Sequence, residues 1–117
     1  MGERISGNLI ISLIGPQCGI RISRSVISAL GWPKCVCFLK SENKQTMAIG
    51  PCAPEEPLAL TVPAEMRTNK DRRMRIYCKQ FTDELFQAND MDPTQNYAIT
   101  GEYDERLNAV VFPLKVL

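Results

Sequence analysis

The chain has 117 residues, of which 44% are hydrophobic and 23% are charged, as is usual for a single globular domain. Its formal net charge of +1 excludes a strongly basic nucleic-acid-binding protein, so any affinity for nucleic acid must come from a local cluster. Histidine, the commonest general base and transition-metal ligand at neutral pH, is absent.

The sequence pattern of the first half of the chain predicts four strands and one short helix. Ser23 or Ser25 can cap this helix, and Gly31 ends it. Its apolar face carries Val26, Ile27 and Leu30. The expected strands are Asn8–Ile14, Ile20–Ser23, Cys35–Lys40 and Gln45–Ile49. The stretch Leu9–Ile14 is too short to span a membrane, so we expect no membrane partner.

A proline-rich segment separates the two halves. Three prolines fall within Gly50–Pro57, which excludes a central strand or a helix there. We therefore expect a semi-rigid linker over residues 50–57.

The second half repeats the order of strand, strand, helix, strand and strand. Met74, Ile76 and Cys78 alternate with Arg73, Arg75 and Tyr77 at the period of a half-buried strand. The helix carries Phe81, Leu85 and Ala88, with Thr82 and Asp83 near its first turn. The expected strands are Leu58–Pro63, Arg72–Cys78, Asn96–Tyr103 and Leu107–Val116.

This repetition predicts an internal duplication within a single domain of residues 1–117. The first unit spans residues 8–51 and the second spans residues 58–116. We expect a mixed, mainly β fold in which two β-β-α-β-β units form one barrel-like core, closed or nearly closed, with pseudo-two-fold symmetry. Val26, Ile27 and Leu30 should then be buried in the same core as Phe81 and Leu85.

A few short motifs connect the first unit to a known family. Ile20-Arg21-Ile22-Ser23, Val26, Ala29-Leu30-Gly31-Trp32 and the apolar return Met47-Ala48-Ile49 resemble the AbrB/MazE-like swapped-hairpin (SpoVT-AbrB) family. Ile22-Ser23 stands where that family has Ile-Pro. In the second unit, Ile76-Tyr77 and Phe86-Gln87 replace the Ile-Pro and Leu-Gly pairs.

The resemblance implies a β-barrel of two intertwined units that binds DNA as a transcriptional regulator or antitoxin. Such proteins are usually homodimers, whereas here one chain would supply both units, so we expect a monomer or a homodimer. The family's DNA-contacting arginine after the turn glycine is not matched, because Cys18-Gly19 stands in that region.

One cluster of basic residues is dense enough to bind nucleic acid. The stretch Arg67–Arg75 holds five basic residues and one acid, and such side chains can neutralise phosphates. The alternative is a solvated hairpin tip whose charges discourage edge pairing. The candidate nucleic-acid-binding residues are Arg21, Arg24, Arg67, Lys70, Arg72, Arg73 and Arg75.

The five cysteines form an odd set without a secretory signal, which predicts reduced thiols in a cytoplasmic protein. Cys35 and Cys37 should share one face of a strand, but no C-x-x-C spacing completes a zinc site. We therefore expect core packing for these cysteines, no metal and no cofactor.

The remaining candidates favour structural interpretations. Glu102, Asp104 and Glu105 fit a solvated hairpin turn better than an acid-base pair. Trp32 fits a plug beneath the first helix better than an exposed stacking platform. With no phosphate loop or nucleophile motif, we expect a protein that is not an enzyme.

The leading hypothesis is thus a DNA-binding transcriptional regulator. The alternatives are a protein-interaction module or accessory protein of a mobile element or phage, and a binder of small ligands inside the barrel. Charge geometry distinguishes the first two. Arginines of both units on one face favour DNA, whereas acids on that same face favour a protein partner.

Overall fold

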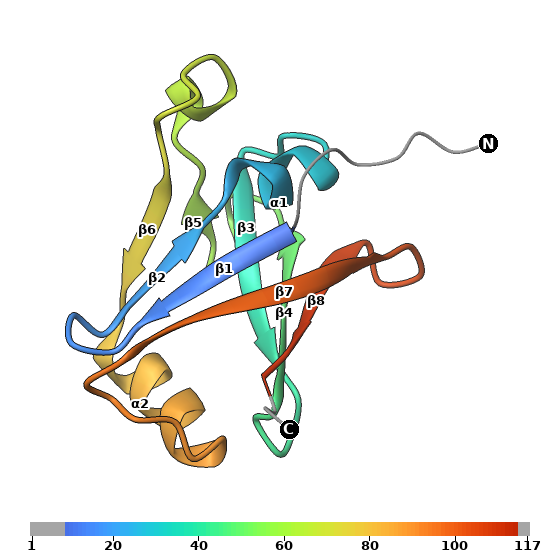
Figure 1. The fold of residues 1–117 in the computed structure, drawn as a ribbon. Helices are drawn as coiled ribbons and strands as arrows, with labels where there is room; N and C mark the ends of the chain where they lie inside the picture. The colour runs from blue at the N-terminus through green and yellow to red at the C-terminus, as the bar shows by residue number, and fades with distance from the viewer. Residues whose placement is uncertain (1–8, 115–117) are drawn as a thin grey trace.

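The computed structural model describes residues 9–114, and Figure 1 shows a curled β-sheet with two α-helices and one 3₁₀ helix. In chain order the elements are β1 (Leu9–Ile14), β2 (Gly19–Ile22), α1 (Arg24–Ala29), β3 (Cys35–Lys40), β4 (Thr46–Pro51), β5 (Leu60–Thr61), the 3₁₀ helix η1 (Ala64–Arg67), β6 (Met74–Tyr77), α2 (Lys79–Ala88), β7 (Asn96–Asp104) and β8 (Ala109–Pro113).

All strand pairs are antiparallel, in the order β5-β3-β4-β8-β7-β1-β2-β6. No pairing joins the end strands β5 and β6 within residues 9–114, so the sheet is a half-barrel and not the closed or nearly closed barrel expected. The mainly β class with two helices is confirmed.

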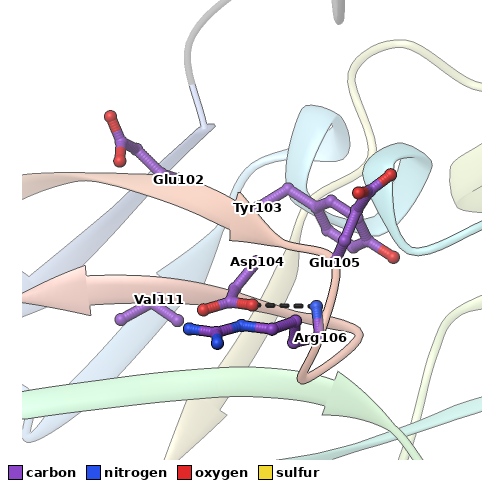
Figure 2. A pocket seen from close by; sticks show the side chains of 6 residues that line it. All are labelled: Glu102, Tyr103, Asp104, Glu105, Arg106 and Val111. Atoms are coloured by element: carbon purple, nitrogen blue, oxygen red, sulfur yellow. Dashed lines mark hydrogen bonds between the residues drawn. The ribbon is translucent and has the colours of Figure 1, made fainter. Parts of the chain in front are cut away.

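Strand β7 connects the two parts of the curled sheet. Its first part pairs with β1 as far as Gly101, and its last part pairs with β8 from Glu102 onwards. Figure 2 shows the turn from β7 into β8, where the Asp104 carboxylate accepts the Arg106 N–H at 2.9 Å.

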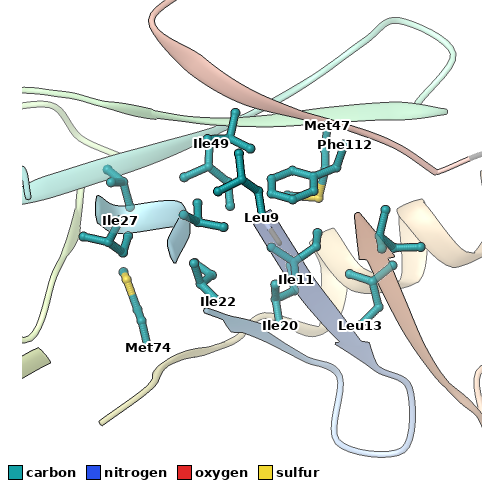
Figure 3. Close-up of a cluster of buried hydrophobic side chains, with 14 of the residues drawn as sticks. Leu9, Ile11, Leu13, Ile20, Ile22, Ile27, Met47, Ile49, Met74 and Phe112 are labelled. Atoms are coloured by element: carbon teal, nitrogen blue, oxygen red, sulfur yellow. The ribbon is translucent and has the colours of Figure 1, made fainter. Parts of the chain in front are cut away.

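The concave side of the sheet is filled by one hydrophobic core. Figure 3 shows side chains from β1, β2, β4, α1, β6 and β8 meeting there. The expected burial of Val26, Ile27 and Leu30 with Leu85 is confirmed, and Phe81 packs against the same cluster half-buried. Side chains thus occupy the interior in which a small ligand would have to bind. The fully buried larger members include Ile11, Leu13, Ile20, Ile22, Ile27, Met47, Ile49, Met66, Leu85, Phe112 and Leu114.

Local signals set the limits of α1. Ser23 takes the extended N-cap conformation but makes no side-chain cap bond; its hydroxyl accepts the Ile10 N–H at 3.4 Å and shares a hydrogen bond of 2.9 Å with the Ser25 hydroxyl. Gly31 adopts a φ of 82° just after the helix, a conformation that glycine accepts without strain.

Three expected elements have different limits in the structure. β5 covers only two residues of the predicted strand Leu58–Pro63, since Leu58 is exposed and Pro63 cannot donate to a ladder. The polar run Glu65–Asp71 predicts a turn, and η1 covers its first three residues. β4 continues to Pro51, two residues into the predicted linker. The C-terminal end of the predicted strand Leu107–Val116 lies outside the described residues.

The helices are short. Within residues 9–114, neither α1 nor α2 has the length and apolar character needed to cross a bilayer.

Candidate nucleic-acid interface

The pairing of β2 with β6 places two arginines directly opposite each other. Arg21 faces Arg75 in this register, and the neighbouring pair Ile22 and Met74 is buried in the core. Because successive side chains of a strand point to opposite faces, both guanidinium groups lie on the outer face of the sheet. One arginine comes from each predicted unit.

The three strands that form the outer face around this pair contribute no acidic side chain to it. β1, β2 and β6 contain no aspartate or glutamate. Ser12 on β1 lies opposite Arg21 and extends the row of polar residues. The exposed Tyr77, at the end of β6, lies over Gly19. A Cβ added to Gly19 would come within 3.0 Å of the tyrosine ring.

Neither arginine has an ion-pair partner among residues 9–114. The Nε atom of Arg21 is buried and lacks a hydrogen-bond acceptor within the same part of the chain. Like charges directly opposite across a strand pair are unfavourable. An anion bound between the two guanidinium groups would remove this repulsion and satisfy their N–H donors.

The structure gives Arg24 contacts that differ from those of the other predicted arginines. Its Nε donates to the Met66 carbonyl and its Nη2 donates to the Arg67 carbonyl, each at 2.7 Å. Its guanidinium also lies 5.2 Å from the centre of the Trp32 ring. Arg24 therefore ties α1 to η1, and its donors are used within the fold.

The loop between η1 and β6 presents the rest of the predicted cluster. Arg67 is exposed at the end of η1, and Lys70 and Arg73 are exposed in the loop that follows. Arg72 donates to the Glu65 carboxylate at 2.8 Å, and this hydrogen bond holds the pKa of Glu65 below its usual value. Arg72 is consequently the one member of the loop cluster that shares its charge with an acid among the described residues.

Trp32 packs against the core and also contacts two arginines. The ring is half-buried and packs against the core, while the guanidinium groups of Arg24 and Arg67 lie 5.2 and 5.8 Å from its centre. Cation–π contacts of this kind hold the two arginines in place. The side chain therefore supports the basic loop instead of offering a free stacking face.

The acids form a separate surface. Glu102, Tyr103, Asp104, Glu105, Arg106 and Val111 line a hollow of about 640 Å³ at the β7–β8 turn. Figure 1 shows this turn well separated from the η1–β6 loop. On α2, Asp83 pairs with Lys79 and Glu84 pairs with Lys40, so these two acids are already matched by lysines.

The cysteines do not gather into a metal centre. No cluster of three or more potential ligands occurs within residues 9–114. Cys35 is buried and Cys37 is half-buried, but Val36, the residue between them, is the one that joins the central core. Cys35 is thus buried as the sequence predicts. Neither Cys35 nor Cys37, however, belongs to the central core cluster that Val36 joins.

Sequence reasoning missed a second hollow on the outer side of β3 and β4. It measures about 320 Å³, and the exposed Leu39 and Leu107 line it together with Cys37, Pro51 and Cys52. The available signal was Leu39, the last residue of a continuous apolar run and the neighbour of the polar turn that begins at Ser41. Leu107 is distant in the sequence and gave no such signal.

Comparison with known proteins adds no family assignment. No family model, curated protein or solved structure matches the chain.

Proposed function

We propose that the protein is a DNA-binding transcriptional regulator of the AbrB-like kind, acting without catalysis in the cytoplasm. The observation that carries the proposal is the cross-strand pair Arg21 and Arg75 on an outer face whose own strands contain no acid. Guanidinium groups bind phosphate oxygens through charge-assisted hydrogen bonds. A phosphate backbone supplies the anion that this pair lacks.

The η1–β6 loop extends the same basic surface. Arg73 is exposed one residue before β6, and strand alternation gives it the direction of Arg75. Arg67, the last residue of η1, and Lys70 in the loop are also exposed. We assign phosphate contacts to Arg21, Arg73 and Arg75, with Arg67 and Lys70 at the margin, and we assign Arg24 to holding the loop.

We further infer that the two halves are duplicated units related by a pseudo-two-fold axis. In support, β4 pairs with β8 and β2 pairs with β6, each strand with its counterpart, while β3 pairs with β5 as β7 pairs with β1. Arg21 and Arg75 then occupy corresponding places in the two units. The lack of a β5–β6 pair, where β1 and β2 do pair, is the departure from symmetry.

The test is the salt dependence of binding to a fluorescent duplex of arbitrary sequence, measured by anisotropy at several salt concentrations. Wild-type protein should lose affinity steeply as salt rises, because each phosphate contact releases counterions. Arg75→Ala should reduce the log-log slope by about one unit, and Arg73→Ala with Arg75→Ala by about two.

Arg106→Ala is the matched control, since it removes the same charge from an exposed position at the acidic turn. It should leave the slope unchanged. Wild-type protein without any salt-dependent affinity for duplex DNA would refute the proposal.

A second candidate function has an observation of its own. The hollow beside Leu39 and Leu107 exposes apolar side chains of the kind that protein partners cover. A protein-interaction module would use this surface. Leu39→Glu with Leu107→Glu would then abolish partner binding and leave DNA affinity unchanged.

A further inference from the structure

Two thiols lie next to each other on the outer side of the β3–β4 hairpin. The sulfur atoms of Cys37 and Cys52 are 2.6 Å apart, and both side chains are half-buried. Cys37 lies opposite Gly50 in the strand register, and Cys52 follows Gly50 by two residues on the same side.

We infer that Cys37 and Cys52 form a dithiol site that is oxidised reversibly to an intramolecular disulfide by a small disulfide such as oxidised glutathione. The bond length in disulfides is about 2.05 Å, so the two sulfur atoms have to move together by only about half an ångström. The backbone around them is already fixed by the ladder and by the hydrogen bond from the Cys52 N–H to the Cys35 carbonyl at 3.1 Å.

The reaction consumes one molecule of oxidised glutathione. The Cys37 thiolate attacks one glutathione sulfur, the glutathione S–S bond breaks, and the first glutathione leaves as a thiolate. Cys52 then loses its proton to solvent and attacks the Cys37 sulfur, which releases the second glutathione. The protein thiols are oxidised by two electrons, and two molecules of reduced glutathione are formed.

The surroundings assign these roles to the two cysteines. Burial and the neighbouring Cys37 raise the pKa of Cys52 to about 12, so Cys52 stays a thiol at neutral pH and reacts in the second step. The hollow lined by Leu39 and Leu107 opens beside the pair and gives a small reagent access. Cys35 is only 6% exposed and is therefore shielded from the first attack.

The experiment equilibrates the reduced, full-length protein with oxidised glutathione at pH 8 and counts thiols after unfolding. The count should fall from five to three and return to five with dithiothreitol. Trypsin digestion without reductant should yield the peptide 35–40 linked to the peptide 45–67. The oxidised form should melt roughly 10 °C higher, because the bond closes the hairpin loop in the unfolded chain.

Variants identify which thiols react. Cys37→Ser and Cys52→Ser should each prevent the linked peptide, whereas Cys35→Ser should still form it, which excludes Cys35 as the partner within peptide 35–40. Cys78→Ser is the matched control, because Cys78 is exposed and lies beside Cys18, whose carbonyl accepts its N–H at 3.1 Å. It should also still form the linked peptide.

Two results with wild-type protein would overturn the inference, whatever the folding of the variants. One is a thiol count that stays at five. The other is a disulfide found only between Cys18 and Cys78 or only between molecules.

Discussion

Gly101 occupies the place where β7 changes its pairing partner from β1 to β8. A Cβ added to it would lie 2.5 and 2.6 Å from two ring carbons of Phe112 and 2.7 Å from the Val111 carbonyl oxygen. Phe112 is fully buried in the core, and close-packed protein interiors leave a ring little room to move. The absence of a side chain at residue 101 is therefore what allows β8 to cross close over β7.

Gly101→Ala should destabilise the fold by about 1–3 kcal/mol, which is the usual cost of overpacking a core. Urea unfolding followed by Trp32 fluorescence measures this change. In a Phe112→Leu background the same substitution should cost less, because the smaller side chain leaves room for the new methyl group. An equal cost in both backgrounds would contradict the steric explanation.

The opposed arginines give a prediction in which stability and binding change in opposite directions. Arg75→Glu would place a carboxylate across the strand pair from Arg21 and replace repulsion by attraction. The free energy of unfolding should rise by about 0.5 kcal/mol, while affinity for duplex DNA should fall by at least tenfold at low salt.

Arg75→Gln separates the two effects, since it removes the repulsion without adding an attraction. Its stability should lie between those of the wild type and Arg75→Glu. A loss of stability in Arg75→Glu would mean that Arg75 has a favourable partner in the folded protein.

At the scale of elements, one side chain connects α1 to η1. Arg24 begins α1 and donates to the carbonyls of the last two residues of η1, Met66 and Arg67, while its guanidinium lies over the Trp32 ring. The basic loop that follows η1 thus takes its position from the first helix. A planar fork of donors is needed for this, which lysine does not have.

Arg24→Ala should therefore cost about 1–3 kcal/mol of stability, as expected for the loss of hydrogen bonds from a charged donor. Arg24→Lys should recover less than half of the loss, as measured by urea unfolding. A phosphate contact at Arg24 would behave differently, since lysine keeps the charge. Full recovery of stability by lysine would contradict the positioning role.

Sequence patterns were sufficient for elements whose partners are close in the chain. Cys35–Lys40 was placed to the residue because five consecutive apolar residues, Cys35 to Leu39, lie between the breaker at Pro33 and the polar turn at Ser41. The end of α1 at Leu30-Gly31 followed from glycine's access to positive φ.

Features that depend on distant partners were not accessible to the same reasoning. The facing of Arg21 and Arg75 requires the register of β2 on β6, which no local pattern specifies. The contact of Cys37 with Cys52 requires β4 to continue through Gly50 and Pro51, where the prolines favoured a linker. The use of Arg24 inside the fold depends on η1, in a stretch where the sequence predicts a polar turn.

On the scale of the whole molecule, the two halves share one sheet and one core. β1, β2 and β4 from the first half pair with β7, β6 and β8 from the second. The core cluster likewise takes Ile11 and Ile49 from the first half and Leu85 and Phe112 from the second. Alone, each half would lose one pairing partner for each of its four strands and would leave its apolar face uncovered.

A chain divided after Glu56, in the proline-rich segment, tests this dependence. Residues 1–56 and 57–117 should each show no cooperative unfolding transition, because in each fragment all four strands lose one pairing partner. An equimolar mixture should regain a cooperative transition detected by circular dichroism. Cooperative unfolding of residues 1–56 alone would show that the first half is an independent domain.

The double pairing of β7 also bears on how the protein acquires its fold during synthesis. β1 ends at Ile14, yet its partner residues in β7 run from Asn96 to Gly101. A ribosome must therefore add more than eighty residues before the first strand can pair on that side, and Ile11 and Leu13 stay without their final neighbours throughout. A nascent chain in this condition offers apolar strands to chaperones and to other nascent chains, so its yield in cells should depend more on chaperone supply than its final stability suggests.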